Sequence, residues 1–308
     1  MEFFKRILVD IDSDATVHPA LDRAIVLARA TGAAVTVTDV MAASPYERRY
    51  LPAHLEEELV TRRRSQLTRI VSAIGDIRAQ AKLLVGRPGT VLTQEVIRGN
   101  HDLLMRSHSR DENGTVTRDF GAVDMELLRQ CPCAVMLVRH GSVVQHPRIA
   151  AAVNVSTIDE VEQALNVKIA TSALALADLV GGAAMLLHAW SPLFERMIRT
   201  HATEDGFAAY VDEARTRAAA DLRKLTQSLD TAFGRVPMIQ RRGKAEDVIL
   251  EFVASEGIDI LVIGTVARGG IPGWLFGNTA ERVLRRLRCS VLTVKPDNFV
   301  SPVRVETD

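Results

Sequence analysis

A glycine-rich stretch near the end of the chain has the residue types of an anion-binding loop. Residues 264–279 read GTVARGGIPGWLFGNT; they follow an apolar run at residues 258–263 and precede the helical pattern AERVLRRLR. Glycines leave backbone N–H groups unobstructed, and the first turn of a helix adds N–H donors and a partial positive charge. The stretch is therefore predicted to be a loop, between a strand and a helix, that can bind a phosphate.

The elements that would position this loop form two copies of one unit. KRILVDIDSD aligns with PRIAAAVNVS, and LLRQCPCAVMLVR aligns with VLRRLRCSVLTVK. Gly121 then falls on Gly277, and Asp102 falls on Asp259. Self-similarity of this kind predicts a tandem repeat. The predicted parts are a first domain at residues 1–140, a linker at 141–147, a second domain at 148–297 and a tail at 298–308.

Both copies alternate short apolar or β-branched runs with amphipathic stretches. The runs predict strands at residues 6–11, 34–40, 79–85, 103–106 and 134–138, and at 149–154, 184–189, 236–240, 260–264 and 291–295. A long helix is predicted at 52–74, with Leu55 and Leu59 in its buried stripe, and four helices are expected in the second copy. This alternation predicts an α/β fold with a parallel sheet and right-handed crossovers, in which ligands bind at the carboxyl ends of the strands.

The spacing of the glycine-rich stretch resembles the nucleotide loop of the universal stress protein family. That loop reads glycine, two residues, glycine, nine residues, glycine, then serine or threonine; here Ala267 replaces the second glycine and Asn278 replaces the serine or threonine. CSVLTVKP is similar to the family's last strand, and the likeness covers nearly the whole chain as a tandem, E-type pair. The resemblance implies two doubly wound, Rossmann-like domains, each with a five-stranded sheet in the order 3-2-1-4-5. It also implies that the two last strands pair into an intrachain pseudo-dimer and leaves homodimer formation open.

The resemblance implies ATP or AMP as a ligand of the second domain, with Mg²⁺ only as a companion of the nucleotide. The positions that carry over are Asn154, Gly264, Ala267, Arg268, Gly269, Gly270, Gly277, Asn278 and Thr279. Asn154 stands where nucleotide-binding members have an aspartate, which in the first copy is Asp12. Some of these residues also have a purely structural interpretation: Asn278, with Glu281 three residues later, fits a helix N-cap in a capping box.

The first copy lacks the glycine-rich loop. Residues 107–120 read SHSRDENGTVTRDF, with one glycine and three acidic side chains. Carboxylates at this place would repel a triphosphate, because like charges raise each other's energy. We therefore predict no nucleotide in the first copy.

Several functions are excluded or disfavoured by absent patterns. The chain has 38 basic and 38 acidic side chains, which argues against nucleic acid as a partner. No apolar run approaches the length of a membrane span, so we expect no membrane insertion. We therefore place the protein in the cytoplasm. It has no GxxxxGK[ST] and no G-x-S-x-G motif. We predict a non-enzymatic stress-response protein, with weak ATP hydrolysis left open. The alternative is a scaffold or interaction protein without nucleotide, holding an apolar or another anionic ligand.

The three cysteines and His188 can each have either a structural or a functional role. Cys131 and Cys133 are separated by one proline and suggest a metal or redox pair, but Cys133 and Cys289 precede the last strand of each copy, which favours packing. His188, at the end of a strand in LLHAW, is expected to be a structural or pocket-lining residue rather than a catalytic base.

Overall fold

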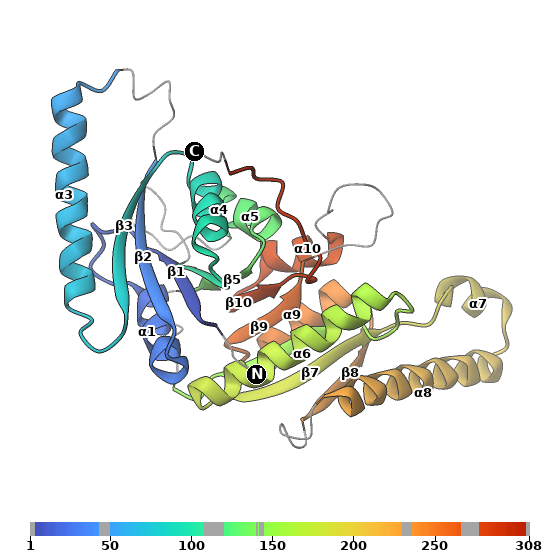
Figure 1. The fold of residues 1–308 in the computed structure, drawn as a ribbon. Coiled ribbons are helices and arrows are strands. Elements are labelled where there is room, and N and C mark those ends of the chain that lie inside the picture. The colour runs from blue at the N-terminus through green and yellow to red at the C-terminus, as the bar shows by residue number, and fades with distance from the viewer. Residues whose placement is uncertain are drawn as a thin grey trace. The chain divides into compact units, whose positions relative to one another are not determined.

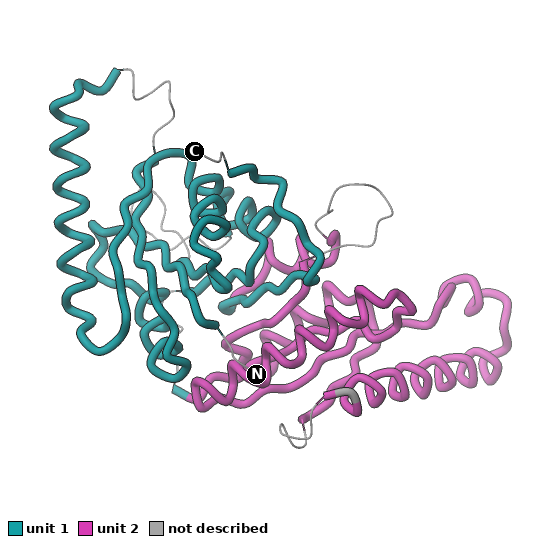
Figure 2. The backbone as a smooth tube through the Cα atoms, viewed as in Figure 1, with its two compact units in different colours: residues 1–145, 289–308 teal, residues 146–288 magenta. Residues whose placement is uncertain are grey.

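The computed structural model of the chain describes residues 4–42, 50–107, 120–139, 141, 145–229, 236–265 and 277–305. The chain forms two compact units, which Figure 2 shows in two colours. Unit 1 consists of residues 1–145 with 289–308, and unit 2 consists of residues 146–288. The end of the chain therefore belongs to the same unit as its beginning. Among the described residues, no helix has the length and apolarity that a membrane crossing needs.

Unit 1 is built on a sheet with the strand order β3-β2-β1-β4-β5-β10. Its elements are β1 (Arg6–Asp10), α1 (Pro19–Thr31), β2 (Ala34–Met41), α3 (Ala53–Ser72), β3 (Ala79–Val85), α4 (Pro88–Gly99), β4 (Leu103–Ser107), α5 (Ala122–Gln130), β5 (Ala134–Val138) and β10 (Ser290–Val294). The first five strands are parallel, and β10 pairs with β5 in antiparallel register. The predicted order 3-2-1-4-5 and the predicted pairing of the two last strands are confirmed.

Unit 2 repeats the first four strands of this order as β8-β7-β6-β9. Its elements are β6 (Arg148–Val153), α6 (Glu160–Val180), β7 (Ala183–Trp190), α7 (Glu195–His201), α8 (Glu204–Ser228), β8 (Met238–Arg242), α9 (Ala245–Ser255), β9 (Ile260–Gly264) and α10 (Asn278–Arg286). All pairs within this unit are parallel. The α/β fold class with two doubly wound repeats is thus the fold of the chain.

Helices cover both faces of each sheet, because the chain reverses direction across the sheet after its third strand. In unit 1, α4 and α5 contact each other, while α1 and α3 pack on β2; in unit 2, α6 contacts α8, and α9 contacts α10 (Figure 1). With right-handed crossovers, this reversal places the first two helices on one face and the last two on the other. The centre of each sheet is closed to solvent, as in β1, where Ile7, Leu8 and Val9 have no exposed surface.

Two local predictions were wrong. Leu55 and Leu59, expected in the buried stripe of α3, are 41% and 42% exposed, and only Leu67 of that helix is buried. Packing of α3 on β3 and β2 therefore buries only the part of the helix around Leu67, although the hydrophobic pattern of the sequence extends over more of α3. The second copy was expected to hold four helices, but the described part of unit 2 has α7 as an additional short helix before α8.

Candidate functional site

A cavity of about 520 Å³ lies at the carboxyl edge of the strands of unit 2. We call it the edge pocket. Its walls come from the ends of β6, β7 and β9, from α6 and α9, and from the first turn of α10: Ala152, Val153, Asn154, Glu162, Leu165, Asn166, Ile169, Leu187, Ala189, Ala245, Ile249, Ile263, Gly264, Gly277, Asn278, Thr279 and Ala280. Most of these side chains are apolar; the polar ones are Asn154, Glu162 and Asn166 on one side, and Asn278 and Thr279 at the start of α10. An apolar cavity with few polar groups is the usual form of a small-molecule site.

Five of the predicted site residues lie together in this pocket. Asn154 follows β6, Gly264 ends β9, and Gly277, Asn278 and Thr279 form the entrance to α10. Parallel strands bring these segments to one edge although more than 100 residues separate them in the sequence. The other predicted residues, Ala267, Arg268, Gly269 and Gly270, lie outside the described residues.

The start of α10 differs from the predicted capping box. Gly277, not Asn278, is the N-cap residue, and Asn278 is the first helical residue. Because glycine has no side chain, no side-chain hydrogen bond caps this helix. The backbone N–H of Gly277 donates to the carbonyl of Thr265 at 3.0 Å, which closes the base of the loop. The next N–H groups, from Asn278 onward, belong to the first helical turn, where helix geometry provides no partner. The predicted anion-binding turn would thus begin at Asn278.

Gly264 is required for close packing behind the pocket. A Cβ atom built on it would lie 2.8 Å from Leu165 Cδ2 and 3.2 Å from Ile169 Cδ1, which are both on α6. These two side chains also line the edge pocket. A larger residue at 264 would therefore push apolar atoms into the cavity.

Asn166 on α6 is a residue that the sequence analysis missed. Its Oδ1 accepts from the backbone N–H of Asn154 at 2.9 Å, and its Nδ2 donates to the backbone carbonyl of Asn154 at 2.7 Å. This double hydrogen bond holds the turn after β6 in place. A polar residue inside an apolar helix stretch was the available indication, but the partner could not be read from spacing.

We expect Asn166→Leu to lower the free energy of unfolding by about 1 kcal/mol, because two backbone groups of Asn154 would lose their partners. Urea unfolding followed by circular dichroism measures this change. Asn154→Ala is the control, since it keeps both backbone groups and the clamp. Equal loss in the two variants would show that the clamp has no part in stability.

A second cavity of about 800 Å³ lies between α6, α8 and the end of β7, and we call it the helix pocket. Its lining is Val155, Ser156, Thr157, Ile158, Glu160, Gln163, Ala164, Asn166, Val167, Trp190, Ser191, Pro192, Leu193, Tyr210, Glu213, Ala214, Arg217, Ala218, Asp221, Lys224 and Leu225. Asn166 lines both pockets, so the two cavities share a wall. Ile158 and Leu193, at this pocket, are 98% and 70% exposed.

His188 lies behind the helix pocket and is fixed by two hydrogen bonds. Its Nδ1 is 3.1 Å from the carbonyl oxygen of Val153, and its Nε2 is 3.3 Å from Ser156 Oγ. Since a carbonyl only accepts, Nδ1 carries the proton, and Nε2 of the neutral ring accepts from Ser156. Burial lowers the pKa of His188, against smaller opposing effects of the Val153 carbonyl and Asp221. The structure thus agrees with a buried, structural histidine beside a pocket.

Acidification should destabilise the protein through His188. Because the folded pKa lies below 6.5, the unfolded chain binds a proton between these two values and the folded chain does not. The free energy of unfolding therefore falls as the pH falls below 6.5, and this part of the pH dependence should vanish in His188→Gln. Urea unfolding at about pH 5 and about pH 7.5 measures it. The exposed His201 supplies the control His201→Gln, which should keep the wild-type dependence.

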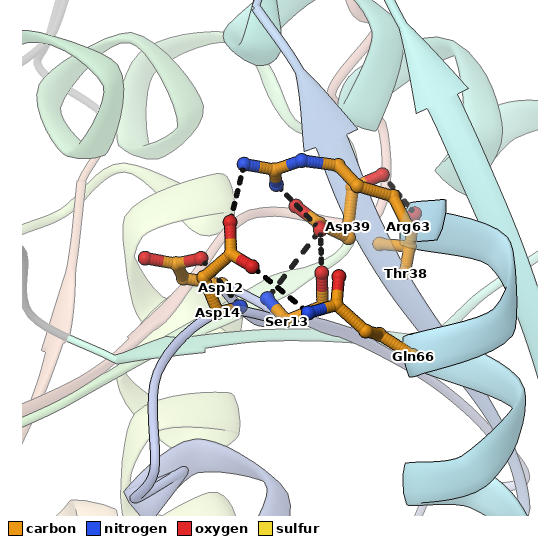
Figure 3. Close-up of polar contacts among 7 residues, drawn as sticks. All are labelled: Asp12, Ser13, Asp14, Thr38, Asp39, Arg63 and Gln66. Atoms are coloured by element: carbon orange, nitrogen blue, oxygen red, sulfur yellow. Dashed lines mark hydrogen bonds and ion pairs between the residues drawn. The ribbon is translucent and has the colours of Figure 1, made fainter. Parts of the chain in front are cut away.

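At the corresponding edge of unit 1 lies a network of polar side chains (Figure 3). Arg63 of α3 bonds to Asp39 Oδ2 at 2.7 Å and to Asp14 Oδ2 at 3.0 Å. Ser13 Oγ donates to Asp39 at 2.5 Å, and Gln66 Nε2 donates to Asp14 at 3.0 Å. This network ties α3 to the turn after β1, where Asp14 corresponds to Ser156 of unit 2. Arg63 thus compensates part of the negative charge of Asp14 and Asp39.

A buried ion triad lies at the place in unit 1 that matches the edge pocket. Arg106 of β4 pairs with Asp10 of β1 and, through Nε at 3.1 Å, with Asp124 of α5. Burial raises the pKa of Asp10 to about 6, and the nearby carboxylates of Asp39 and Asp124 add to this against the opposing charge of Arg106. In the repeat alignment, and in the register of β1 with β4 and β6 with β9, the matching residues of unit 2 are Ala152, Ile263 and Ala280.

Comparison with known proteins identifies relatives over the full length. The Universal stress protein family profile matches residues 3–139 and 156–295. Universal stress protein E of Salmonella typhi is 29% identical, covering 100% of this chain and 99% of the relative, and the Escherichia coli K12 protein of that name is 28% identical with the same coverage. A Pseudomonas aeruginosa PAO1 protein of unknown function has a similar solved fold, with a TM-score of 0.69, 22% identity, and coverage of 96% of this chain and 94% of that one. A putative universal stress protein from Pseudomonas aeruginosa UCBPP-PA14 has a TM-score of 0.68, 23% identity, and coverage of 96% and 95%.

Proposed function

The chain belongs to the universal stress protein family, and we propose that it is a stress-response protein whose unit 2 binds an adenine nucleotide, ATP or AMP, in the edge pocket. The observation that carries this proposal is the meeting of Gly264, Asn154 and the first turn of α10 around one cavity.

The walls of the edge pocket suit the two halves of a nucleotide. A volume of about 520 Å³ lies within the usual range of ligand pockets. Apolar side chains such as Leu187 and Ile169 offer a surface for a base, while Asn278 and Thr279 at the helix start offer donors and a partial positive charge for phosphates. Mg²⁺ would accompany the phosphates and would require no protein site of its own.

We propose that the protein acts by binding rather than by catalysis. The chain lacks the motifs of nucleotide hydrolases, and the polar groups of the edge pocket include no nucleophile with a neighbouring base among the described residues. Release of phosphate from ATP at the rate of the nucleotide in buffer is the expected result. Faster release, lost in Arg268→Ala, would establish weak hydrolysis instead.

Calorimetric titration with ATP, ADP and AMP, each with and without Mg²⁺, tests nucleotide binding. We expect a measurable heat and a rise in the melting temperature, because a ligand that binds only the folded state stabilises it. No heat and no thermal shift at about 1 mM nucleotide would refute nucleotide binding. The family assignment would remain, since it rests on the sequence.

The helix pocket favours a second candidate, a binding protein for an apolar ligand. Its volume of about 800 Å³ lies between two long helices, and its rim carries the exposed Ile158 and Leu193. Mass spectrometry of the denatured, purified protein separates the two candidates. A co-purifying nucleotide supports the first function, and a lipid-like mass supports the second. Trp190 lines the helix pocket and not the edge pocket, so in a Trp274→Phe variant, where Trp190 is the single tryptophan of the chain, a fluorescence change on ligand addition would locate the ligand in the helix pocket.

We further propose a cytoplasmic location, without nucleic acid or a membrane as partner. The equal numbers of basic and acidic side chains support this proposal. Fractionation of cells followed by immunodetection tests the location. Light scattering of the purified chain tests whether two copies associate into a homodimer.

A further inference from the structure

Two cysteines of unit 1 lie in direct contact outside the pockets described above. Cys131 ends α5, Cys133 precedes β5, and their Sγ atoms are 3.4 Å apart. Cys131 has no exposed surface, whereas Cys133 is only half-buried. Of the two residues, Cys133 is thus the one with surface open to solvent, and its sulfur is in contact with the inner one.

A buried ammonium group lies beside this pair. Lys295 follows β10, is 3% exposed, and donates through Nζ to the carbonyl oxygen of Cys131. The same Nζ lies 4.4 Å from the centre of the Phe299 ring. Burial lowers the pKa of Lys295 to about 8, and the two sulfurs oppose this effect. A cation held next to thiols favours a thiolate, the reactive form of cysteine.

The two thiols share one negative charge unequally. Burial opposes ionisation of Cys131, but the hydrogen bond with Cys133 and the charge of Lys295 outweigh it, so the pKa of Cys131 is lowered. Burial and the neighbouring sulfur raise the pKa of Cys133. The pair therefore titrates as a unit in which a proton moves between two sulfurs already in contact.

The second repeat shows that packing does not require this pair. Cys131 matches Leu287, which is fully buried, and Cys133 matches Cys289, which is also buried. An apolar leucine thus fills the place of Cys131 after α10. Within the described residues, no group of three or more His, Cys, Asp and Glu side chains is arranged to hold a metal ion, so a metal site does not account for the pair either.

We propose that Cys131 and Cys133 form a reversible disulfide when the protein meets a hydroperoxide. Transfer of the Cys133 proton to Cys131 turns the outer sulfur into a thiolate, which attacks the peroxide; an S–O bond forms, the O–O bond breaks, and the leaving oxygen takes a proton to become water or an alcohol. The second thiol then displaces the hydroxyl group, which leaves as water, and the S–S bond forms. The two sulfurs lose two electrons, and the peroxide gains them. This property belongs to unit 1 and is independent of nucleotide binding in unit 2.

The test uses the full, reduced chain treated with hydrogen peroxide, then denatured and alkylated. Cleavage after Arg129 and Arg139 places both cysteines in one peptide, apart from Cys289. We expect this peptide to lose the mass of two hydrogen atoms, to resist alkylation, and to regain both thiols with dithiothreitol. Over-oxidation to sulfinic acid, alkylation of both thiols, or a link to Cys289 would overturn the proposal.

Matched variants separate a specific pair from general oxidation. Cys131→Ser and Cys133→Ser should each abolish the intramolecular product, whereas Cys289→Ser should leave its yield unchanged. Lys295→Met should slow the reaction several-fold at neutral pH, and the loss should shrink at higher pH, where the thiols ionise without the cation. Thermal unfolding of each variant establishes that it is folded. A rate in folded Lys295→Met equal to that of the wild type would remove Lys295 from the proposal, and retention of the product in Cys131→Ser would refute the pair.

Discussion

Replacement of Arg106 by isoleucine alone should lower the free energy of unfolding by about 3–5 kcal/mol, the largest effect that we expect for one substitution in this chain. Arg106 compensates Asp10 and Asp124, whose side chains are 7% and 0% exposed. Without it, the two buried carboxylates would lose the guanidinium that compensates them, and their protonation or hydration would cost free energy. Urea unfolding of the wild type and of Arg106→Ile measures the difference.

The second repeat provides the control, because it holds the same three places with apolar residues. The triple variant Asp10→Ala, Arg106→Ile, Asp124→Ala copies Ala152, Ile263 and Ala280. Apolar replacement of a complete buried ion group is often neutral in stability, so most of the loss should be recovered. A triple variant no more stable than the single one would mean that Asp124, which also accepts from the N–H of Gly121 at 3.0 Å, is needed for α5.

The pH dependence of the triple variant gives a further check. Since the pKa of Asp10 is raised from 3.8 to about 6, the folded chain binds a proton more tightly than the unfolded chain between these values. The free energy of unfolding of the wild type therefore decreases as the pH rises through this window. The decrease should be smaller in the triple variant, which lacks Asp10.

Thr279→Asp should weaken nucleotide binding at least ~30-fold, which is about 2 kcal/mol, without loss of stability. Thr279 is exposed, lines the edge pocket and lies in the first turn of α10. A carboxylate there is favourable for the helix dipole by about 0.3–1 kcal/mol, but it repels a phosphate bound at the same N–H groups. Titration calorimetry with ATP and urea unfolding measure the two effects, which have opposite signs.

Thr279→Asn is the matched control for charge. It has a polar side chain of similar size, so it should retain affinity within a few-fold. Equal affinities of the Asp and Asn variants would mean that the phosphates do not lie at the start of α10. Nucleotide binding elsewhere in the chain would then have to be sought by crystallography with bound ATP.

The two repeats show how far the same architecture can diverge at its ligand edge. In unit 2, small and apolar residues such as Ala152 and Ile263 line a cavity, whereas in unit 1 their counterparts Asp10 and Arg106 form an ion pair. The prediction that unit 1 holds no nucleotide was based on the acidic residues 107–120, most of which lie outside the described residues. The triad supplies a separate physical reason for the same expectation.

The sequence alone determined the repeat, the order of the strands and of all helices except α7, and the segments that meet at the carboxyl edge of unit 2. These features depend on hydrophobic period and on turn residues, which act over a few neighbours in the chain. Gly32 is an example: it ends α1 at φ 71°, a conformation in which glycine has no Cβ penalty.

Only the tertiary structure decided which side chains face one another across elements. The clamp of Asn166 on Asn154, the triad around Arg106 and the ammonium of Lys295 beside Cys131 each join residues from different elements. Their energies come from desolvation and from hydrogen bonds at fixed distances, and these depend on how helices pack on a sheet. Local sequence pattern sets where an element begins and ends, but packing sets which polar groups become neighbours and whether a cavity remains between them.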